Sequence, residues 1–344
     1  MTFKTAIALS GGVDSLVAAA LLKDRGHTLL GIHFTTGYND VSPDRIDQIA
    51  RRLEIPLEFV DVGEPFRRKV IDYFIRSYRE GKTPNPCLVC NSVIKFGAVL
   101  AEAERLGARL LATGHYARIQ RDGEGRCRMM RGVDPDKDQS YFLAFLSQAQ
   151  LSRAVFPLGG LTKAGVRRLA EERGLIPAKR RESQDVCFIS SSCGRFLEQE
   201  GGITPLPGPI ADAAGRILGT HPGLHHFTVG QRRGINCPAS APYYVLDLDP
   251  RKNRLVVGFK SELPVDRCRL SGVHWIVPPP ESPVRLSVRI RYRHQAVPAV
   301  FSPEEGGWGT MVFDRPEAAV TPGQGAVFYS GELVLGGGWI ERYR

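Results

Sequence analysis

The sequence predicts a mixed α/β chain in which a doubly wound parallel sheet comes first and β structure follows. Up to about residue 112, short apolar runs alternate with stretches of helical periodicity, which is typical of a parallel sheet covered by helices on both faces. Beyond about residue 201, short strands between Gly and Pro turns indicate small antiparallel structures. We therefore expect an N-terminal α/β domain over residues 1–200, a small mostly-β central domain over residues 201–262 and a C-terminal antiparallel β-barrel over residues 263–344.

Local patterns predict the individual elements. Short apolar runs indicate parallel strands at residues 5–9, 29–34, 57–60 and 109–112. Apolar residues at helical spacing indicate helices at residues 44–53, 65–80, 92–106, 141–146 and 162–173. The last helix is expected to be capped by Thr162 and to end near Gly174. Residues 81–90 are expected to form a loop and residues 179–189 an irregular segment. Alternating patterns predict the later strands at residues 208–219, 225–234, 243–249, 254–259, 285–292, 296–301, 309–314 and 325–330.

Composition limits the classes of protein to which the chain can belong. It has 344 residues, 42% of them hydrophobic and 24% charged, as in ordinary globular proteins with room for two or three domains. No apolar stretch approaches the length of a membrane span and the start of the chain lacks a signal-peptide pattern, so we expect a cytoplasmic protein with no membrane partner. Seven cysteines, an odd number, indicate free thiols rather than a disulfide framework.

The net charge of +10 favours a polyanionic partner, and RNA is the main candidate. A basic surface kept for solubility is the simpler alternative. Local clusters favour the first interpretation, and one of them has a tyrosine among its arginines. The clusters are Lys179-Arg180-Arg181, Arg232-Arg233, and Arg285, Arg289, Arg291 and Arg293 with Tyr292.

The segment SGGVDS, residues 10–15, lies between the first strand and the first helix. Paired glycines let the backbone turn sharply and present bare N–H groups, to which the helix dipole adds partial positive charge, so this loop is suited to bind an anion. It is neither the P-loop pattern nor G-x-G-x-x-G. We expect Ser10 and Ser15 to donate to phosphate, and Asp14 to act through Mg²⁺ or to orient the loop. A plain strand–helix turn is the alternative.

Two further segments place thiols among residues that favour chemistry. Prolines fix the backbone before Cys90, which we expect immediately before a helix, where the dipole would lower the pKa of its thiol. Cys187 lies among polar residues at 182–189. The other cysteines lack such surroundings and are interpreted as incidental, with Cys87 considered below: Cys127, Cys193, Cys237 and Cys268.

These motifs together resemble the bacterial and mitochondrial tRNA-specific 2-thiouridylases, which belong to the N-type ATP pyrophosphatases. The matching segments occur in the family's order along nearly the whole chain: SGGVDS, NPCLVCN (85–91), GHYAR (114–118), GVDPDKDQSYFL (132–143), FPLG (156–159), SQDVCFI (183–189), TVGQRRG (228–234), RIRYRH (289–294) and TPGQ (321–324). The resemblance implies an N-terminal fold like the adenine nucleotide alpha hydrolases, followed by a central domain and a barrel. It also implies that these domains hold the anticodon arm of tRNAs for Glu, Gln and Lys.

The resemblance implies a reaction that uses ATP and Mg²⁺. The C2 oxygen of the wobble uridine is adenylylated, pyrophosphate leaves, and sulfur then displaces AMP to give 2-thiouridine. Cys187 would carry the sulfur as a persulfide received from a donor protein, a cysteine desulfurase or a relay carrier. Cys90 would assist the release of sulfur and leave a transient disulfide with Cys187. The target base must leave the anticodon stack to reach them.

The remaining site residues follow from the same resemblance. The ATP pocket corresponds to Ala8, Leu9, Ser10, Gly11, Gly12, Val13, Asp14, Ser15, Phe34 and Gly114. Contacts with the tRNA and its target base correspond to Asn85, Pro86, Cys87, His115, Lys137, Asp138, Gln139, Arg291, Tyr292 and Gln324. Without the resemblance, a residue such as His115 is more often a structural histidine at a strand end, with its hydrogen bonds satisfied, than a functional one. Arg291 would likewise more often belong to a solvated surface.

Two departures from the family pattern leave alternatives open. Cys87 stands where the family usually has Asp, so a carboxylate for proton handling at the base is missing and a Cys87-x-x-Cys90 pair is created. With Cys187 this makes three thiols, as in related tRNA thiolases that hold a [4Fe–4S] cluster with one iron open. The persulfide route and a cluster ligated by these three cysteines are therefore both retained. The second departure is a short segment, HFTTGYND, at residues 33–40.

Other classes of function also remain. The enzyme alternative is another pyrophosphate-loop ATPase, such as a lysidine-forming ligase, an NAD or GMP synthetase, or a thiamine-pathway sulfurtransferase. Enzymes that transfer nitrogen need no paired cysteines, so their activity would survive replacement of Cys187. The loss of the usual Asp also allows a non-catalytic RNA-binding or sulfur-carrying protein.

Overall fold

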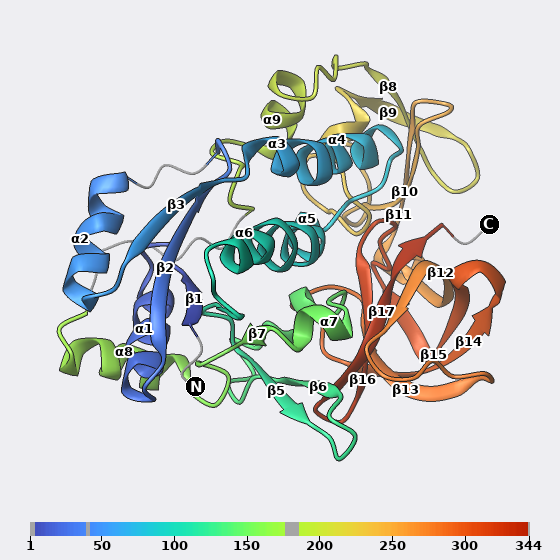
Figure 1. Ribbon diagram of the computed structural model, residues 1–344. Helices are drawn as coiled ribbons and strands as arrows, with labels where there is room; N and C mark the ends of the chain where they lie inside the picture. Colours follow the sequence, from blue (N-terminus) through green and yellow to red (C-terminus); the bar gives the residue numbers. More distant parts are fainter. Residues whose placement is uncertain (1–3, 39–41, 176–185, 343–344) are drawn as a thin grey trace. The chain divides into compact units, whose positions relative to one another are not determined.

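The computed structural model describes residues 4–38, 42–175 and 186–342, and the chain divides into two compact units (Figure 1). Unit 1 consists of Met1–Val70, Cys87–Phe188 and Ser330–Leu335. Unit 2 consists of Ile71–Pro86, Ile189–Tyr329 and Gly336–Arg344. Both units are therefore built from segments that are far apart in the sequence.

Unit 1 is organised around a five-stranded parallel sheet of order β3-β2-β1-β4-β7. The predicted strands at residues 5–9, 29–34, 57–60 and 109–112 are confirmed, and β7 is an additional two-residue strand. The strands are β1 (Lys4–Ala8), β2 (Thr28–Thr35), β3 (Leu57–Asp61), β4 (Leu110–Ala112) and β7 (Ala154–Val155). Because parallel strands end at one edge of the sheet, the segments that follow β1 and β4 meet there.

Three helices cover one face of this sheet: α1 (Val13–Asp24), α2 (Pro43–Leu53) and α8 (Lys163–Glu172) (Figure 1). Their buried residues Leu16, Ile46 and Val166 share one hydrophobic core with Ile7 of β1. The predicted caps of α8 are confirmed, since Thr162 accepts a hydrogen bond from the backbone of Gly165 and Gly174 adopts a positive φ of 59°.

A continuous helix, here called the cysteine helix, runs through α5 (Pro86–Val89), η2 (Cys90–Val99) and α6 (Leu100–Arg105). The prediction of a loop up to residue 90 is wrong, because a helix accepts proline in its first turn and this one begins at Pro86. Its middle segment η2 has the wider π-helical hydrogen-bond pattern. By length and composition the helix is apolar enough to span a membrane, contrary to expectation, but its residues Leu88, Ile94 and Phe96 are buried in the protein, as in a core helix.

Unit 1 contains several shorter elements. The helical pattern predicted for residues 65–80 is confirmed as a continuous helix that starts in this unit, with α3 (Gly63–Phe66) and η1 (Arg67–Ile71), and continues in α4 of unit 2. An unpredicted hairpin, β5 (Ala117–Arg121) and β6 (Cys127–Arg131), pairs through Met130 with Leu333. The helix predicted at residues 141–146 is a single 3-10 turn, η3 (Ser140–Leu143), before α7 (Gln148–Leu151).

The first part of unit 2 has α4 (Asp72–Arg79), α9 (Cys193–Gln199) and a four-stranded sheet of order β10-β11-β8-β9. Its strands agree with three of the four predicted ones and are β8 (Gly208–Ala211), β9 (Ile217–His221), β10 (Tyr244–Asp249) and β11 (Arg254–Gly258). The strand predicted at residues 225–234 is wrong. That segment forms η4 (Leu224–His226) and turns, because Gly230 and Gly234 adopt positive φ angles of 87° and 85°.

The second part of unit 2 is a closed antiparallel barrel of six strands in the order β12-β15-β14-β13-β16-β17, with β12 pairing back to β17. The strands are β12 (Pro264–Trp275), β13 (Val284–Arg289), β14 (Val297–Glu304), β15 (Trp308–Ala318), β16 (Gly325–Ser330) and β17 (Leu333–Glu341), with short turns η5 (Lys260–Glu262) and η6 (Glu305–Gly307). Trp275, Phe301 and Phe328 form an aromatic cluster in the barrel. The predicted fold class is confirmed, although the sequence patterns missed β12 and β17.

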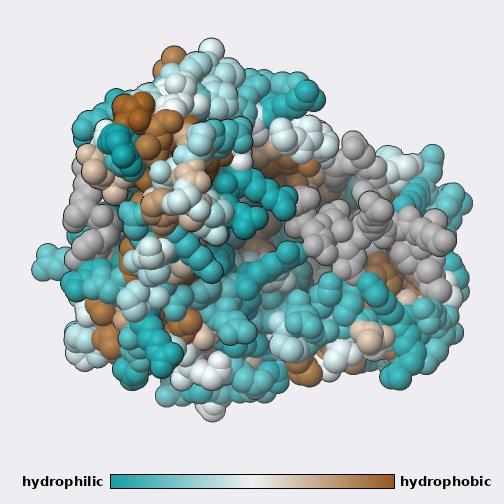
Figure 2. Space-filling model, turned by 180° about the vertical axis from the view of Figure 1, so that it is seen from behind, coloured by the Kyte–Doolittle hydropathy of each residue, from teal (hydrophilic) through white to brown (hydrophobic). Residues whose placement is uncertain are grey.

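Hydrophilic residues cover most of the face drawn in Figure 2, and hydrophobic residues gather there only in separate areas. The large hydrophobic side chains that the structure describes as exposed come from different elements: Phe59, Val93, Val133, Leu206, Ile217, Phe259, Val265 and Val312. The core of each unit therefore holds most of its large apolar side chains.

Candidate active site

The glycine loop is connected to distant parts of unit 1 through Asp14. Both carboxylate oxygens of Asp14 accept hydrogen bonds from Lys163 Nζ, at 2.8 and 2.9 Å, and Oδ1 also accepts one from the Tyr116 hydroxyl at 2.8 Å. Lys163 is only 7% exposed. These contacts fit the loop-orienting role predicted for Asp14, and a role towards Mg²⁺ stays a prediction. Sequence patterns did not single out Lys163, which lies 149 residues away at the start of α8.

The loop itself leaves the first turn of α1 open to an anion. Gly11 has a positive φ of 74°, and Gly12 stands at the N-cap without a side chain that could bond the first N–H groups of the helix. The Ser15 hydroxyl donates to the Gly12 carbonyl at 2.8 Å and lies 3.4 Å from the Ser10 hydroxyl. These hydroxyls brace the turn, and the bare N–H groups with the helix dipole are suited to bind an anion.

The end of β4 packs directly against this loop. A Cβ atom on Gly114 would lie 3.0 Å from the Asp14 carbonyl carbon and 3.1 Å from the Ser15 nitrogen, so only glycine allows so close an approach. Ala8 and Leu9 lie at the end of β1, and the partly buried Phe34 lies near the end of β2. The structure thus brings the predicted ATP-pocket residues to one edge of the sheet.

Aromatic packing connects this edge to the cysteine helix. His115 is buried, and its Nδ1 atom lies 2.7 Å from the Thr113 hydroxyl. Its ring packs edge-on against Phe156 at 5.8–5.9 Å, as does the ring of Phe96 from the cysteine helix. Burial, and to a smaller degree the charge of Lys95, holds the pKa of His115 well below its usual value. His115 is therefore a neutral side chain that Phe156 connects to Phe96 of the cysteine helix, next to Gly114, which packs against the glycine loop.

Three thiols share one electrostatic environment in unit 1. The pKa of Cys87 is raised to about 11, mainly by burial and to a smaller degree by Cys187, while Lys95 opposes the shift. Burial raises the pKa of Cys90 to about 12, where Lys95 again lowers it and both other thiols raise it. The prediction that the helix dipole lowers the pKa of Cys90 is wrong, because desolvation of the thiolate outweighs any favourable charge at this position.

The cation that opposes these shifts is Lys95, on the cysteine helix. In an α-helix, two residues five apart are separated by about 140° around the axis, whereas the i to i+5 hydrogen bonds of a π-helix bring them towards the same side. The π-helical pattern of η2, which begins at Cys90 and includes Lys95, is thus suited to hold the ammonium group near the thiols. Lys95 is the strongest charge that lowers the pKa of Cys187 as well.

Cys187 differs from the other two thiols because its side chain is exposed. Nearby protein atoms still desolvate it enough to raise its pKa. The next residue, Phe188, is buried and packs against Phe66 and Tyr38 with ring centroids 5.9 and 6.3 Å apart. Phe188 therefore anchors the segment and leaves the thiol accessible. Residues 183–185 of the SQDVCFI motif lie outside the described residues.

The residues predicted to contact tRNA in unit 1 have structural partners of their own. Asp138 is buried and accepts hydrogen bonds from the backbone N–H groups of Gly132 and Ser140. The Gln139 side chain accepts one from the backbone of Tyr116 at 3.0 Å. Both side chains thus support the segment that carries Tyr116 to Asp14, while Lys137 beside them is partly exposed.

In unit 2, Arg291 is exposed in the turn between β13 and β14. Arg289 supports that turn by donating to the backbone oxygens of Tyr292 and His294. Gln324 instead donates a hydrogen bond from Nε2 to the carbonyl of Thr83 at 2.9 Å. Thr83 precedes the partly exposed Asn85 by two residues and the buried Pro86 by three. Of the predicted basic clusters, Lys179-Arg180-Arg181 lies outside the described residues.

Comparisons with known proteins agree with this architecture. Family models match consecutive parts of the chain: one described as the tRNA methyl transferase HUP domain at residues 3–191, one as the tRNA methyl transferase PRC-barrel domain at residues 194–259, and one as the aminomethyltransferase beta-barrel domain at residues 265–340. The parallel sheet with its glycine loop and these matches define a HUP-domain protein with two β domains after the parallel sheet.

Curated relatives narrow this class. The protein from Desulfosudis oleivorans named tRNA-specific 2-thiouridylase MnmA is 51% identical over 98% of this chain and 94% of its own length. Proteins of the same name from Geotalea uraniireducens and Trichormus variabilis are each 44% identical, over 98% and 99% of this chain and 95% and 99% of their own lengths. The chain belongs to the family of tRNA-specific 2-thiouridylases, which confirms the resemblance seen in its motifs.

Proposed function

We propose that this protein is a tRNA-uridine 2-sulfurtransferase that uses ATP to convert the wobble uridine of tRNAs for Lys, Glu and Gln to 2-thiouridine, with release of AMP and pyrophosphate. One observation carries the proposal. Cys87 and Cys90 share one helix with Lys95, a cation that also lowers the pKa of Cys187, and Gly114 packs against the glycine loop in the same unit. A nitrogen-transferring pyrophosphate-loop enzyme has no need of such a group of thiols.

The first step activates a poor electrophile. The C2 oxygen of the flipped uridine attacks the α-phosphorus of ATP, and the bond to pyrophosphate breaks. The N–H groups of Gly12 and the first turn of α1 stabilise the departing charge. Mg²⁺ bound to the phosphates would neutralise part of that charge. Asp14 is not offered as its ligand, because Lys163 and Tyr116 already occupy the carboxylate.

The second step delivers sulfur. The thiolate of the exposed Cys187 attacks the outer sulfur of a persulfide on a donor protein, a cysteine desulfurase or a relay carrier. Cys187 becomes the persulfide, and the donor's cysteine leaves as a thiolate. The terminal sulfur attacks C2 and AMP leaves with the bonding pair, so that the base is joined to Cys187 through a disulfide. The Cys90 thiolate then attacks the Cys187 sulfur, which releases 2-thiouridine and leaves a Cys90–Cys187 disulfide for an external thiol to reduce.

A [4Fe–4S] cluster held by Cys87, Cys90 and Cys187 is the second candidate route. The effect of the three thiols on one another's pKa values fits it, since a cluster with one open iron needs three cysteine ligands. When bound, such a cluster would supply an iron with an open position for sulfide. Cys87 would then have a role that the persulfide route does not give it. Anaerobic reconstitution followed by absorption and Mössbauer spectroscopy distinguishes the routes, since full thiolation by iron-free protein excludes the cluster.

The central experiment uses the full chain with ATP, Mg²⁺, a persulfide donor and unmodified tRNA. We expect pyrophosphate release that tRNA stimulates, together with a mass increase of 16 Da at the wobble uridine, the difference between sulfur and oxygen. Pyrophosphate release with ammonia incorporation would instead identify a nitrogen-transferring enzyme. Binding of tRNA without pyrophosphate release would leave an RNA-binding protein as the conclusion. Loss of 2-thiouridine from anticodon nucleosides of a deletion strain would give the same answer in cells.

The finer assignments belong to the same proposal. The ATP-pocket residues are those given above around Ser10 and Gly114, and the base is contacted by Asn85, Pro86 and Cys87. Exposed Arg291 with Tyr292, and Lys137, are the most accessible of the predicted tRNA contacts. His115, Asp138, Gln139 and Gln324 would act by holding those surfaces in place. We retain three domains bounded at residues 200 and 262, and a cytoplasmic location.

A further inference from the structure

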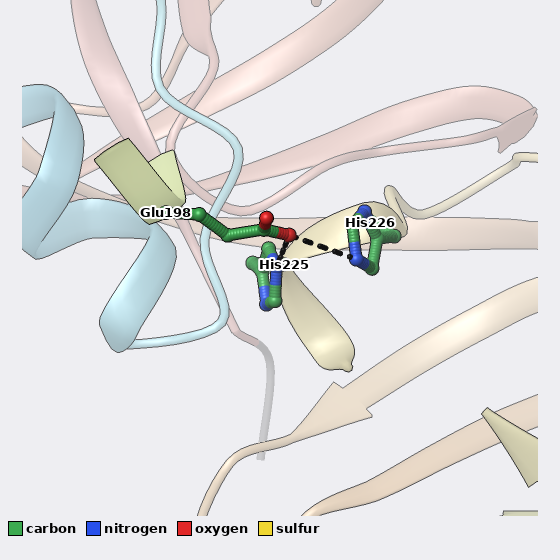
Figure 3. A group of neighbouring side chains, drawn as sticks. All are labelled: Glu198, His225 and His226. Atoms are coloured by element: carbon green, nitrogen blue, oxygen red, sulfur yellow. Dashed lines mark hydrogen bonds and ion pairs between the residues drawn. The ribbon is translucent and has the colours of Figure 1, made fainter. Parts of the chain in front are cut away.

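Glu198, His225 and His226 converge in unit 2, at a place that the proposed reaction does not use (Figure 3). Glu198 comes from α9, and the two histidines are consecutive in the 3-10 turn η4. One carboxylate oxygen, Glu198 Oε1, lies 3.1 Å from Nε2 of His225 and 3.4 Å from Nε2 of His226. The ligand atoms of all three residues lie within 4.8 Å of one another.

These distances fit a tetrahedral metal ion. Zinc binds imidazole nitrogen and carboxylate oxygen at about 2.0–2.2 Å, so two ligand atoms on a tetrahedral ion are about 3.3–3.6 Å apart. The two oxygen–nitrogen separations of 3.1 and 3.4 Å therefore need little change for an ion to enter. On both histidines the Nε2 atom faces the carboxylate, so one ion beside Glu198 could take a nitrogen from each ring. Two histidines and a glutamate form a known zinc ligand set.

The local backbone makes room for both rings. A Cβ atom on Gly194 of α9 would lie 2.3 Å from Nδ1 of His226, and one on Gly223 would lie 2.7 Å from Cε1 of His225. Glycine at both positions lets the two rings approach each other, with centroids 4.1 Å apart. The Ser192 hydroxyl caps α9 by accepting from the Arg195 backbone, which fixes the start of the helix that carries Glu198.

The exposure of the three side chains gives the site one open side. The His225 side chain is 5% exposed, whereas those of Glu198 and His226 are 31% and 34% exposed. An ion could thus reach the ligands from solvent and keep a fourth position for water. Two neutral imidazoles and one carboxylate would leave a divalent ion with a net charge of +1. These nitrogen and oxygen ligands suit a divalent ion better than a soft monovalent ion, which prefers sulfur.

We propose that Glu198, His225 and His226 bind a divalent transition-metal ion of the zinc type, with one coordination position open. The ion joins α9 to η4 and stabilises unit 2. Since α9 begins six residues after Cys187, it also fixes the segment that follows this thiol in the chain. The site is independent of the proposed sulfur transfer, so either conclusion can fail without the other.

The test must separate this site from the seven cysteines, because thiolates are also common zinc ligands. Full-length protein is stripped with a chelator and titrated with Zn²⁺ alone, and the bound metal is counted. We expect wild type to bind one equivalent more than His226→Gln and Glu198→Gln. Glutamine at 198 keeps an acceptor for hydrogen bonds but removes the anionic ligand. His27→Gln is the matched control, because His27 lies in unit 1, where its Nδ1 atom is 3.0 Å from the Thr5 hydroxyl. This variant should bind as many ions as wild type.

Two further readouts make the result unambiguous. Zn²⁺ should raise the unfolding temperature of wild type and His27→Gln by several degrees more than that of His226→Gln. Co²⁺ at this site should add visible bands without the strong near-ultraviolet bands of thiolate ligation. Equal zinc counts in wild type and both site variants would overturn the proposal. So would an equal loss of zinc in the His27→Gln control.

Discussion

The glycine loop and the group of three thiols differ in how they are held, although both lie in unit 1. Asp14 of the loop has three hydrogen bonds to side chains on other segments, and Gly114 packs against the loop backbone. Among the thiols, Cys87 and Cys90 belong to the first turns of a long helix, whereas Cys187 is exposed and anchored by the neighbouring Phe188.

This difference matches the two halves of the proposed reaction. Adenylylation needs fixed N–H donors around a phosphate, and preorganised polar groups are most effective when they do not move. Sulfur delivery needs a thiol that another protein can reach and that can then react inside the site. A buried thiolate is costly, so the pKa values of Cys87 and Cys90 are raised and one cation, Lys95, has to offset the cost. The experiments below act on one region and leave the other intact.

The largest effect is expected for Cys187→Ser. A hydroxyl cannot carry a persulfide, so formation of 2-thiouridine should fall about 10³-fold or more. Pyrophosphate release should stay within about twofold of wild type, because the glycine loop is unchanged. Cys237→Ser, which removes a thiol of unit 2, is the control and should thiolate normally. Parallel loss of both activities in Cys187→Ser would show that the two regions do not act separately.

Lys163→Met tests the other region. It removes the ammonium group from Asp14 and leaves a carboxylate beside the loop with only the Tyr116 hydroxyl, so the loop loses its fixed position. We expect tRNA-stimulated pyrophosphate release to fall about 10²-fold, the order of loss that a small misplacement causes. Alkylation of Cys187 by iodoacetamide should not change. Lys23→Met, which removes an exposed pair with Glu54, is the matched control. Undiminished pyrophosphate release in Lys163→Met would refute the role given to this pair.

Lys95→Met should have a smaller, pH-dependent effect. The thiolate is the reactive form, and its fraction grows as pH rises towards the pKa of the thiol. Since Lys95 lowers the pKa of Cys187, its removal should shift the profile of alkylation against pH towards alkaline values and slow the reaction at neutral pH roughly 3–10-fold. Mass spectrometry of Cys187 after timed alkylation measures this. The exposed Lys69→Met should leave the profile in place.

The smallest effect concerns His115 and stability. Burial holds the pKa of the folded state well below the ordinary value of 6.5, so below pH 6.5 the unfolded chain binds a proton that the folded chain excludes. The stability that depends on neutral His115 is therefore complete above pH 6.5 and is lost as pH falls, by at most about 1.4 kcal/mol per pH unit. In His115→Gln, the free energy of unfolding should fall less steeply between pH 6.5 and 5. Equal slopes in urea unfolding would count against it.

The sequence predicted the features that depend on neighbouring residues. Four strands of the parallel sheet and the glycine loop follow from short patterns in their own residues. Both ends of α8 follow from the capping residues Thr162 and Gly174. The N-terminal fold was predictable for the same reason, because each βα unit carries its own hydrophobic period. The fold class therefore needed no information about distant contacts.

The features that the sequence did not predict depend on contacts across the chain. Nothing near Lys163 indicates that its ammonium group is buried against Asp14, because the partner is 149 residues away. The predicted position of Cys90 near the start of a helix suggested a lowered pKa, but burial of the thiol raises the pKa instead. The closing strand β17 contains three consecutive glycines and was missed for that reason. At one of them, Gly336, a Cβ atom would lie 2.1 Å from the His274 carbonyl oxygen, so β17 can pair with β12 here only with glycine. The same glycine lacks the apolar side chain by which a strand is predicted from sequence.

The hydrogen bonds around Thr83 have a consequence for attempts to divide the chain. Thr83 donates its N–H to the Pro322 carbonyl at 2.8 Å and accepts from the Gln324 side chain at 2.9 Å, and both partners lie in the C-terminal segment. A shortened chain ending at residue 262 would strip both tethers from the peptide that enters the cysteine helix three residues later. We therefore expect a fragment without the last eighty or so residues to leave the peptide at Thr83 without these two hydrogen bonds.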